Sequence, residues 1–253
     1  MDCAICVVPA APVRKKPSHK AEMVNQLLFG EGMRILKMKK KWLRIQTVPD
    51  NYEGWIRINM IMDVDENLLY GSFVTAGLLN TIQTGEMTMH VPVGSTLPAF
   101  KNGEGAVGNL KYKFEGSFFN RNEIKPDSDL VTHLTRQWLN APYLWGGRTP
   151  LGVDCSGFVQ VIFKMMGIDL LRDARLQVDQ GMKIRRLEDS QCGNLAFFRN
   201  NKRKITHVGI LLSPTQIIHA SGKVRVDSID KKGIINTDTG KRTHSLVAIR
   251  KLW

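Results

Sequence analysis

Residues 141–160 read APYLWGGRTPLGVDCSGFVQ, a loop rich in glycine and proline that leads a cysteine into a helix. The helix is expected over Cys155–Met166, with Gly167 just beyond its end, where a left-handed backbone suits glycine. A helix N-terminus carries partial positive charge and free N–H groups, which favour a thiolate over a thiol. Small neighbours leave room for a substrate carbonyl and for an oxyanion hole. We therefore predict that Cys155 is a nucleophile rather than a buried structural cysteine.

A nucleophilic cysteine needs a base, and the base needs a group that orients it. His207 and His219 lie at the edges of two expected strands joined by a turn around residues 213–215. If Leu211 pairs with Ile217, both histidines face the same side, where diagonal neighbours lie about 7–8 Å apart. A register shifted by one residue would place them on opposite faces and exclude the pair. The contexts of the other four histidines do not indicate catalysis: His19, His90, His133 and His244.

The length of 253 residues allows two to three small domains. The first 125 residues show short expected strands between glycine-rich and polar turns, which predicts two small β-barrels. A polar stretch at 121–127 is expected to be a linker, and helical spacing follows from Ser128, with Ser128 or Asp129 as its cap. Helices followed by a run of strands predict an α+β domain. The expected domains are 1–62, 63–127 and 128–253.

The composition narrows the class of protein. With 43% hydrophobic and 23% charged residues, the chain is not a wholly disordered protein. No apolar run is long enough for a membrane span. The net charge of +13 raises nucleic acid, an anionic envelope polymer or an acidic substrate as partners. Because no nucleic-acid-binding motif is present, we do not expect nucleic acid to be the partner.

The cysteines predict neither a disulfide scaffold nor a metal site. Cys3 and Cys6 form a C-x-x-C without a second pair, and Cys192 is expected to be a small buried hydrophobe. We therefore expect no metal and no cofactor. The N-terminus has an acid before a short apolar stretch, which does not fit a secretory signal. Both the cytoplasm and, after removal of a signal, the bacterial cell envelope remain open.

Four motifs stand in one order along the second half of the chain: PYLWGG at 142–147, DCSGFVQ at 154–160, HVGI at 207–210 and IHAS at 218–221. With them, residues 128–253 resemble the NlpC/P60 family of papain-like cysteine peptidases, which cut bacterial cell-wall peptides. The resemblance implies a papain-like fold with Cys155 as nucleophile, His207 as general base and acid, and His219 as its orienting residue. It also implies that Tyr143 stabilises the oxyanion. One departure is Asn194, where the family usually has an aspartate, so any ion pair there is weakened.

A further resemblance lies at Arg172-Asp173-Ala174 with Gln177. It is similar to the dipeptidyl-peptidase VI subgroup, which cleaves γ-D-glutamyl–L-diamino acid bonds and carries bacterial SH3-like domains ahead of the catalytic domain. The first of those domains supplies an acid and a tyrosine that hold the free amine of an L-Ala residue. The resemblance implies a substrate-binding set that includes an amine pocket: Glu22, Tyr52, Asp154, Ser156 and Arg172. The alternative for Arg172 and Asp173 is the solvated start of a helix.

The expected function is thiol-dependent hydrolysis of the γ-D-glutamyl bond to L-Lys or meso-diaminopimelate, in murein peptides that begin with a free L-Ala. An amine pocket would refuse N-acylated peptides, which favours recycling or turnover of released peptides. The expected partners are murein peptides, and a monomer is expected. One alternative is a general hydrolase of intact wall peptides, and another is a non-catalytic protein that binds cell-wall polymer through its basic surface.

Overall fold

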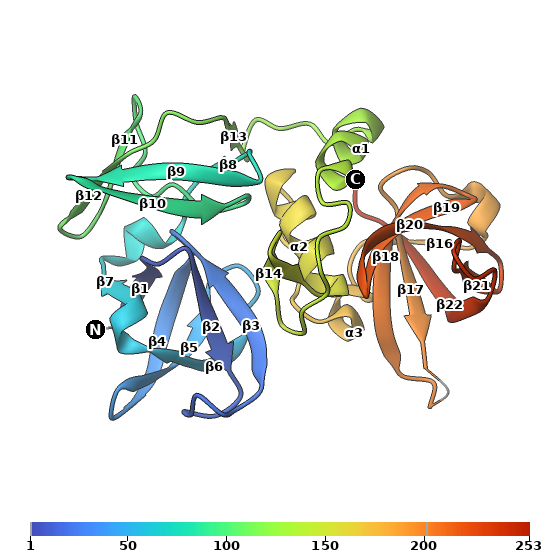
Figure 1. The fold of residues 1–253 in the computed structure, drawn as a ribbon, viewed down its shortest axis with the longest axis horizontal. Helices are drawn as coiled ribbons and strands as arrows, with labels where there is room; N and C mark the ends of the chain where they lie inside the picture. The colour runs from blue at the N-terminus through green and yellow to red at the C-terminus, as the bar shows by residue number, and fades with distance from the viewer. Residues whose placement is uncertain (1, 201) are drawn as a thin grey trace. The chain divides into compact units, whose positions relative to one another are not determined.

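The computed structural model describes residues 2–200 and 202–253 and divides them into two compact units (Figure 1). The first unit contains residues 2–124 together with Trp145–Pro150, and the second contains Lys125–Leu144 and Leu151–Trp253. The chain first passes between the units inside the stretch that was expected to be a linker. The segment Trp145–Pro150 comes from the loop that precedes Cys155, so part of that loop belongs to the first unit.

The first unit begins with a seven-stranded antiparallel sheet in the order β3-β2-β6-β5-β4-β1-β7. Buried and more exposed residues alternate in β2, as the two-residue period of a strand requires. The sequence did not predict β1, which is only four residues long, or β2, which contains a proline. The elements are β1 (Cys3–Cys6), β2 (Ala10–Arg14), β3 (Met23–Leu28), β4 (Gly32–Lys39), β5 (Trp42–Thr47), β6 (Glu53–Arg57), η1 (Ile58–Met60) and β7 (Ile61–Asp63).

A four-stranded sheet, ordered β10-β9-β12-β11, and the pair β13-β8 complete the first unit. Ile5 and Phe29, from the expected domain 1–62, pack in one hydrophobic core with Val91 and Phe114, from the expected domain 63–127. The domain limits at residues 62 and 127 therefore stay predictions. The elements are η2 (Glu66–Leu69), β8 (Phe73–Thr75), β9 (Leu79–Thr84), β10 (Met87–Pro92), β11 (Glu104–Val107), β12 (Leu110–Lys113) and β13 (Phe118–Asn120).

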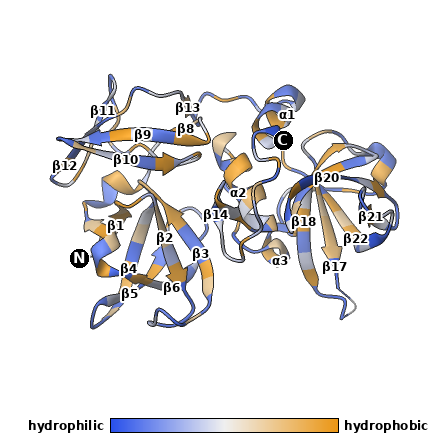
Figure 2. Ribbon diagram, in the orientation of Figure 1, coloured by the Kyte–Doolittle hydropathy of each residue, from blue (hydrophilic) through white to orange (hydrophobic). Residues whose placement is uncertain are grey.

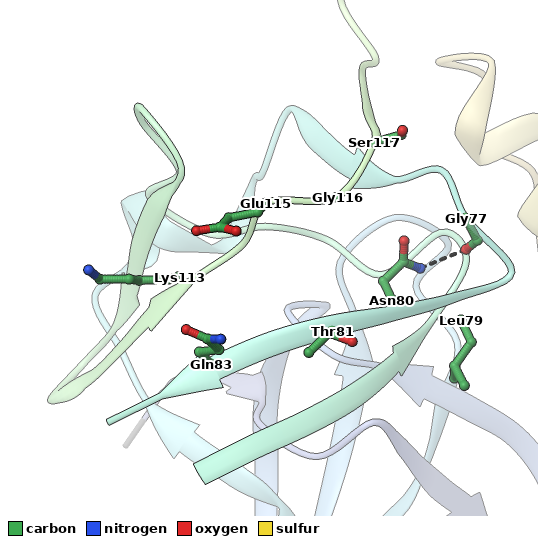
Figure 3. Close-up of a pocket in the computed structure, with 9 residues that line it drawn as sticks. All are labelled: Gly77, Leu79, Asn80, Thr81, Gln83, Lys113, Glu115, Gly116 and Ser117. Carbon is green, nitrogen blue, oxygen red and sulfur yellow. Dashed lines mark hydrogen bonds between the residues drawn. The ribbon is translucent and has the colours of Figure 1, made fainter. Parts of the chain in front are cut away.

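A hollow of about 360 Å³ lies beside β9 and β12, and Figure 3 shows the side chains that line it. Asn80 lines the hollow and donates a hydrogen bond to the carbonyl oxygen of Gly77 over 2.6 Å. Lys113 and Glu115 line it as well. None of the residues that line this hollow belongs to the predicted site.

A buried ion pair holds the segment Trp145–Pro150 within the first unit. The guanidinium of Arg148, on β14 (Arg148–Thr149), binds both carboxylate oxygens of Glu31 over 2.6 and 2.9 Å. It also donates to the carbonyl oxygen of Gln26, whose side-chain oxygen accepts the Arg148 backbone N–H. The side chains of Arg148 and Glu31 are 5% and 2% exposed. A charge buried this deeply is tolerated because its partner satisfies it, and removing either partner is costly.

The second unit is built on a seven-stranded sheet, ordered β16-β22-β17-β18-β19-β20-β21, in which β21 also pairs with β22 and closes the sheet. The helix α2 contacts β18 and β19 (Figure 1). Every residue of α2 is buried, and Figure 2 shows hydrophobic residues along both α2 and β17. The elements are α1 (Ser128–Arg136), β15 (Gly152–Val153), α2 (Cys155–Met165), α3 (Ala174–Gln177), β16 (Met182–Ile184), η3 (Leu187–Asp189), β17 (Leu195–Arg199), β18 (Ile205–Ser213), β19 (Gln216–Ser221), β20 (Lys223–Asp230), β21 (Gly233–Ile235) and β22 (Arg242–Lys251).

The ends of the two longer helices follow ordinary capping chemistry. Asp127 caps α1 by accepting the Leu130 N–H over 2.8 Å, so the expectation of Ser128 or Asp129 as cap is wrong. Asp154 caps α2 in the same way, and Gly167 follows that helix with φ +78°. Strands predominate and helices are few among the described residues, so the α+β class expected for residues 128–253 stays a prediction in its detail. Among the described residues, no helix is long and apolar enough to cross a membrane.

We expect Arg148→Ala to lower the stability of the first unit by about 3–5 kcal/mol, because Glu31 would remain buried without its guanidinium partner. Arg44→Ala serves as the control, since its ion pair with Glu53 is half-exposed and should contribute about 1 kcal/mol or less. Chemical denaturation followed by tryptophan fluorescence measures both. Equal stability of the two variants would show that the buried pair is not a principal stabilising contact.

Candidate active site

Cys155 opens α2 and is 5% exposed. Its Sγ lies 4.0 Å from the carbonyl oxygen of Thr206, the residue before His207. Burial, followed by the negative charge of Asp154, raises the pKa of the thiol to about 12. This differs from the expectation that the helix N-terminus favours a thiolate, because loss of solvent outweighs the favourable backbone contacts. The resting Cys155 is a thiol.

The hairpin of β18 and β19 has the register that pairs the two predicted histidines. Leu211 lies opposite Ile217, and a bulge between Leu211 and Ser213 lets Ser213 pair with Gln216 beside the turn. Nε2 of His207 and Nδ1 of His219 are 2.7 Å apart, and both rings are buried. Gly209 makes room for this contact, since a Cβ there would lie 2.9 Å from the Cβ of His219. The hairpin therefore brings the two rings into direct hydrogen-bond contact.

The imidazole of His207 is neutral in this environment. Burial lowers its pKa well below the ordinary value of 6.5, and the neighbouring rings of His219 and His244 lower it further. A neutral imidazole retains the lone pair that a general base needs. The second unit thus combines a protonated thiol with an unprotonated base.

Two side chains that sequence reasoning missed complete this cluster. Asp227 on β20 accepts a hydrogen bond from Nε2 of His219 over 3.0 Å. His244 on β22 stacks on His207, with ring centroids 4.1 Å apart and an interplanar angle of 26°. The interpretation that the context of His244 is unremarkable is therefore wrong. The available signal for Asp227 was its place on the strand that directly follows β19, with which β20 forms a hairpin.

A second buried cluster joins three predicted substrate-binding residues. The two terminal guanidinium nitrogens of Arg172 donate to the carboxylate of Asp154 over 3.0 and 2.6 Å, and Nη1 also donates to the hydroxyl of Ser156 over 2.9 Å. Arg172 is 1% exposed, so the alternative of a solvated helix start is wrong for it. Asp173 stands at the start of α3, as that alternative supposed. The charge of Asp154 is therefore already balanced by a buried guanidinium.

Tyr143 lies just before the segment that belongs to the first unit. Its backbone N–H donates to the carbonyl oxygen of Gly222 over 3.0 Å, and it forms a bridge with Val153. Burial, and after it the charges of Cys155 and Asp154, raise the pKa of its phenol above the ordinary value. The phenol therefore stays protonated and can donate a hydrogen bond.

Glu22 and Tyr52, the two predicted residues of the first unit, lie in different settings. Glu22 accepts a hydrogen bond from the indole nitrogen of Trp145 over 2.9 Å and pairs with the ammonium group of Lys15 over 3.3 Å. The backbone N–H of Tyr52 donates to the hydroxyl of Thr47 over 2.9 Å. Their part in substrate binding stays a prediction.

The other three cysteines, Cys3, Cys6 and Cys192, are free thiols. Within residues 2–200 and 202–253, no group of three or more histidine, cysteine, aspartate or glutamate side chains is placed to hold a metal ion. Cys3 and Cys6 are buried free thiols. Cys192 is half-buried rather than fully buried, with its Sγ 3.6 Å from the carbonyl oxygen of Ser128.

Comparison with known proteins identifies two parts of the chain. Residues 140–243 match the NlpC/P60 family, and residues 13–61 match the bacterial dipeptidyl-peptidase Sh3 domain. Dipeptidyl-peptidase 6 of Lysinibacillus sphaericus is 25% identical, over 90% of this chain and 92% of its own length. A gamma-D-glutamyl-L-lysine dipeptidyl-peptidase of Bacillus cereus is also 25% identical, over 88% of this chain and 75% of its own length.

The crystal structure of an NlpC/P60 family protein from Bacillus cereus has the same fold. It aligns with a TM-score of 0.83 over 98% of this chain and 99% of that chain, at 19% sequence identity. The order of the motifs, the paired histidines and these matches all indicate the same family. The chain belongs to the NlpC/P60 family and carries a bacterial SH3-like domain ahead of its papain-like domain.

Proposed function

We propose that this protein is a cysteine peptidase that cleaves the γ-D-glutamyl–L-diamino acid bond of murein peptides with a free N-terminal L-Ala. The observation that carries the proposal is the 2.7 Å contact between His207 and His219, in the unit where Cys155 opens a helix. The names of two relatives, dipeptidyl-peptidase 6 and gamma-D-glutamyl-L-lysine dipeptidyl-peptidase, support the substrate class.

In the proposed reaction, His207 takes the proton of the Cys155 thiol as the sulfur attacks the γ-carbonyl carbon of the D-glutamyl residue. The C–N bond then breaks, and the imidazolium returns its proton to the leaving amine of the diamino acid. Water, activated by His207, hydrolyses the thioester and restores the thiol. The phenol of Tyr143 donates a hydrogen bond to the oxyanion in both halves.

Charge separation in this scheme occurs as the substrate reacts, and not before. A buried thiol with a raised pKa and a buried imidazole with a lowered pKa favour the neutral pair at rest. The negative charge on sulfur and the positive charge on His207 form together, so each stabilises the other in the transition state.

Selection for a free amine is the finer part of the proposal. Because Arg172 already balances Asp154, Asp154 alone does not offer an unpaired negative charge. An ammonium group needs an anionic partner when it leaves water. The resemblance assigns that role to Glu22, with Tyr52 as its hydroxyl partner.

The pH dependence of the reaction follows from the lowered pKa of His207 and the raised pKa of Cys155. Since the pKa of His207 is lowered, kcat/KM should stay level on acidification to pH 6.5 and fall only below it. Since the pKa of Cys155 is raised to about 12, its alkylation by iodoacetamide should keep rising across the alkaline range. Peptide mapping by mass spectrometry follows Cys155 separately from the other thiols. A plateau of alkylation near neutral pH would instead indicate a preformed thiolate.

Substrate choice tests the proposed function directly. We expect cleavage of L-Ala-γ-D-Glu-L-Lys or its diaminopimelate counterpart, and loss of about 100-fold or more in kcat/KM when the L-Ala amine is acetylated, because a site built for a polar group rejects its absence strongly. Cys155→Ala should abolish turnover of either peptide. Equal rates on free and acetylated peptides would favour a general wall hydrolase, and turnover by Cys155→Ala would exclude the cysteine mechanism.

Glu22→Gln tests the contribution of the first unit. Loss of the carboxylate should raise KM for the free-amine peptide by about tenfold, the effect of a weakened charged hydrogen bond. Glu66→Gln, which removes a partner of Arg34 in a largely exposed ion pair, is the matched control and should leave KM unchanged. Steady-state kinetics on both variants decides the point. An unchanged KM for Glu22→Gln would remove Glu22 from the substrate-binding set.

A further inference from the structure

Asp227 ends a row of three buried side chains on neighbouring strands. His207 lies on β18, His219 on β19 and Asp227 on β20. The contacts run from His207 Nε2 to His219 Nδ1 over 2.7 Å, and from His219 Nε2 to Asp227 Oδ2 over 3.0 Å. His219 and Asp227 are 1% and 2% exposed, so water does not compete freely for these atoms. The row therefore behaves as one connected hydrogen-bond chain.

Besides His219, two groups bind the carboxylate of Asp227, and both are hydrogen-bond donors. Arg225 donates from Nε to Oδ2 and from Nη2 to Oδ1, each over 2.9 Å. The backbone N–H of Thr237 donates to Oδ1 over 2.9 Å. Burial would raise the pKa of Asp227, but the hydrogen bonds from His219, Thr237 and Arg225 outweigh it and lower the pKa. Asp227 is therefore an ionised carboxylate, which can only accept hydrogen bonds.

The direction of each hydrogen bond in the row follows from that charge. Since the carboxylate of Asp227 accepts, His219 must carry a proton on Nε2. In the tautomer of His219 that carries its single ring proton on Nε2, Nδ1 has a lone pair and accepts from His207. His207 then carries its own proton on Nε2, and its Nδ1 retains the lone pair. Nδ1 is the ring nitrogen left to receive the thiol proton.

We propose that Asp227 is a positioning residue that sets the tautomers of His219 and, through it, of His207, so that Nδ1 of His207 is available as the base. The inference rests on the proposed function in one respect, namely that His207 serves Cys155. Without the anion, His219 could present Nδ1–H to His207, which would place the proton of His207 on Nδ1 and remove the base.

The other titratable and charged groups near His207 and His219 do not change this assignment of the ring protons. His244 from β22 stacks flat on His207 and bonds through Nδ1 to the hydroxyl of Thr243 over 2.8 Å. Burial lowers the pKa of His244 to about 4, so it is neutral near neutral pH. Cys155 from α2 is a thiol, and Arg225 is balanced by Asp227 and by the exposed Asp238. None of these groups supplies a competing acceptor to Nε2 of His219.

The variant Asp227→Asn keeps the size of the side chain and removes its charge. In serine proteases the equivalent change lowers kcat about 10⁴-fold through the wrong histidine tautomer, and at one histidine further away we expect about 10²-fold with little change in KM. Asp238→Asn, which removes the exposed partner of Arg225, is the control and should retain kcat within about twofold. A kcat for Asp227→Asn equal to that of the control would overturn the proposal.

A double-variant cycle separates positioning from general support of the fold. If Asp227 acts through His219, then Asp227→Asn should have little further effect on kcat in a His219→Gln background. Additive losses would show that Asp227 acts by another route and would overturn the proposal.

Nitrogen-15 NMR of the histidine rings tests the same claim without any substrate. We expect the wild-type protein to show Nε2–H on both His207 and His219, and Asp227→Asn to show a population with Nδ1–H. Nδ1–H on His207 in the wild-type protein would overturn the proposal, even if Asp227→Asn fails to fold. Because this measurement needs no turnover, failure of wild type to cleave γ-D-glutamyl peptides would count against the proposed function alone.

Discussion

The hydrogen bond between two buried imidazoles is the contact on which the chemistry of the second unit depends. His207 and His219 lie 2.7 Å apart in a place that water does not reach freely, so a positive charge on His207 is opposed by burial and by its neighbour. The base is neutral as a result. The same burial keeps Cys155 protonated, and in the proposed reaction the pair becomes charged only while it reacts. Cys155 and His207 thus form no ion pair with each other before substrate arrives.

The stretch of residues 141–160 is divided between the two units, and a buried guanidinium–carboxylate pair holds it in each. Arg148 binds Glu31 within the first unit, and Arg172 binds Asp154 within the second. Both pairs are almost fully buried, and each arginine makes a two-pronged contact that a lysine could not reproduce. The sequence between residues 141 and 160 therefore serves packing as much as catalysis. Each of these buried pairs is neutral, so neither contributes to the net charge of +13.

Local features of the site could be predicted from the sequence. The helix that begins at Cys155 follows from the loop before it, and the histidine pair follows from the register of a short hairpin. Asp227 lies on β20, which forms a hairpin with β19, so the same reasoning about register could have found it. His244 could not be predicted in the same way, because it reaches the site on β22, which pairs with β17 from a distant part of the chain. The pKa of Cys155 was misjudged for a similar reason. Burial depends on everything packed around the thiol, whereas the helix N-terminus is visible in the sequence.

An affinity label tests the central claim, that Cys155 attacks the γ-carbonyl of a peptide with a free amine. The reagent is L-Ala-D-Glu whose γ-carboxyl group is converted to a chloromethyl ketone, with its N-acetylated form as the matched control. We expect the free-amine reagent to alkylate Cys155 in step with loss of peptidase activity, and the acetylated form to react far more slowly. Activity lost with the label on Cys3, Cys6 or Cys192, or on no cysteine, would contradict the account.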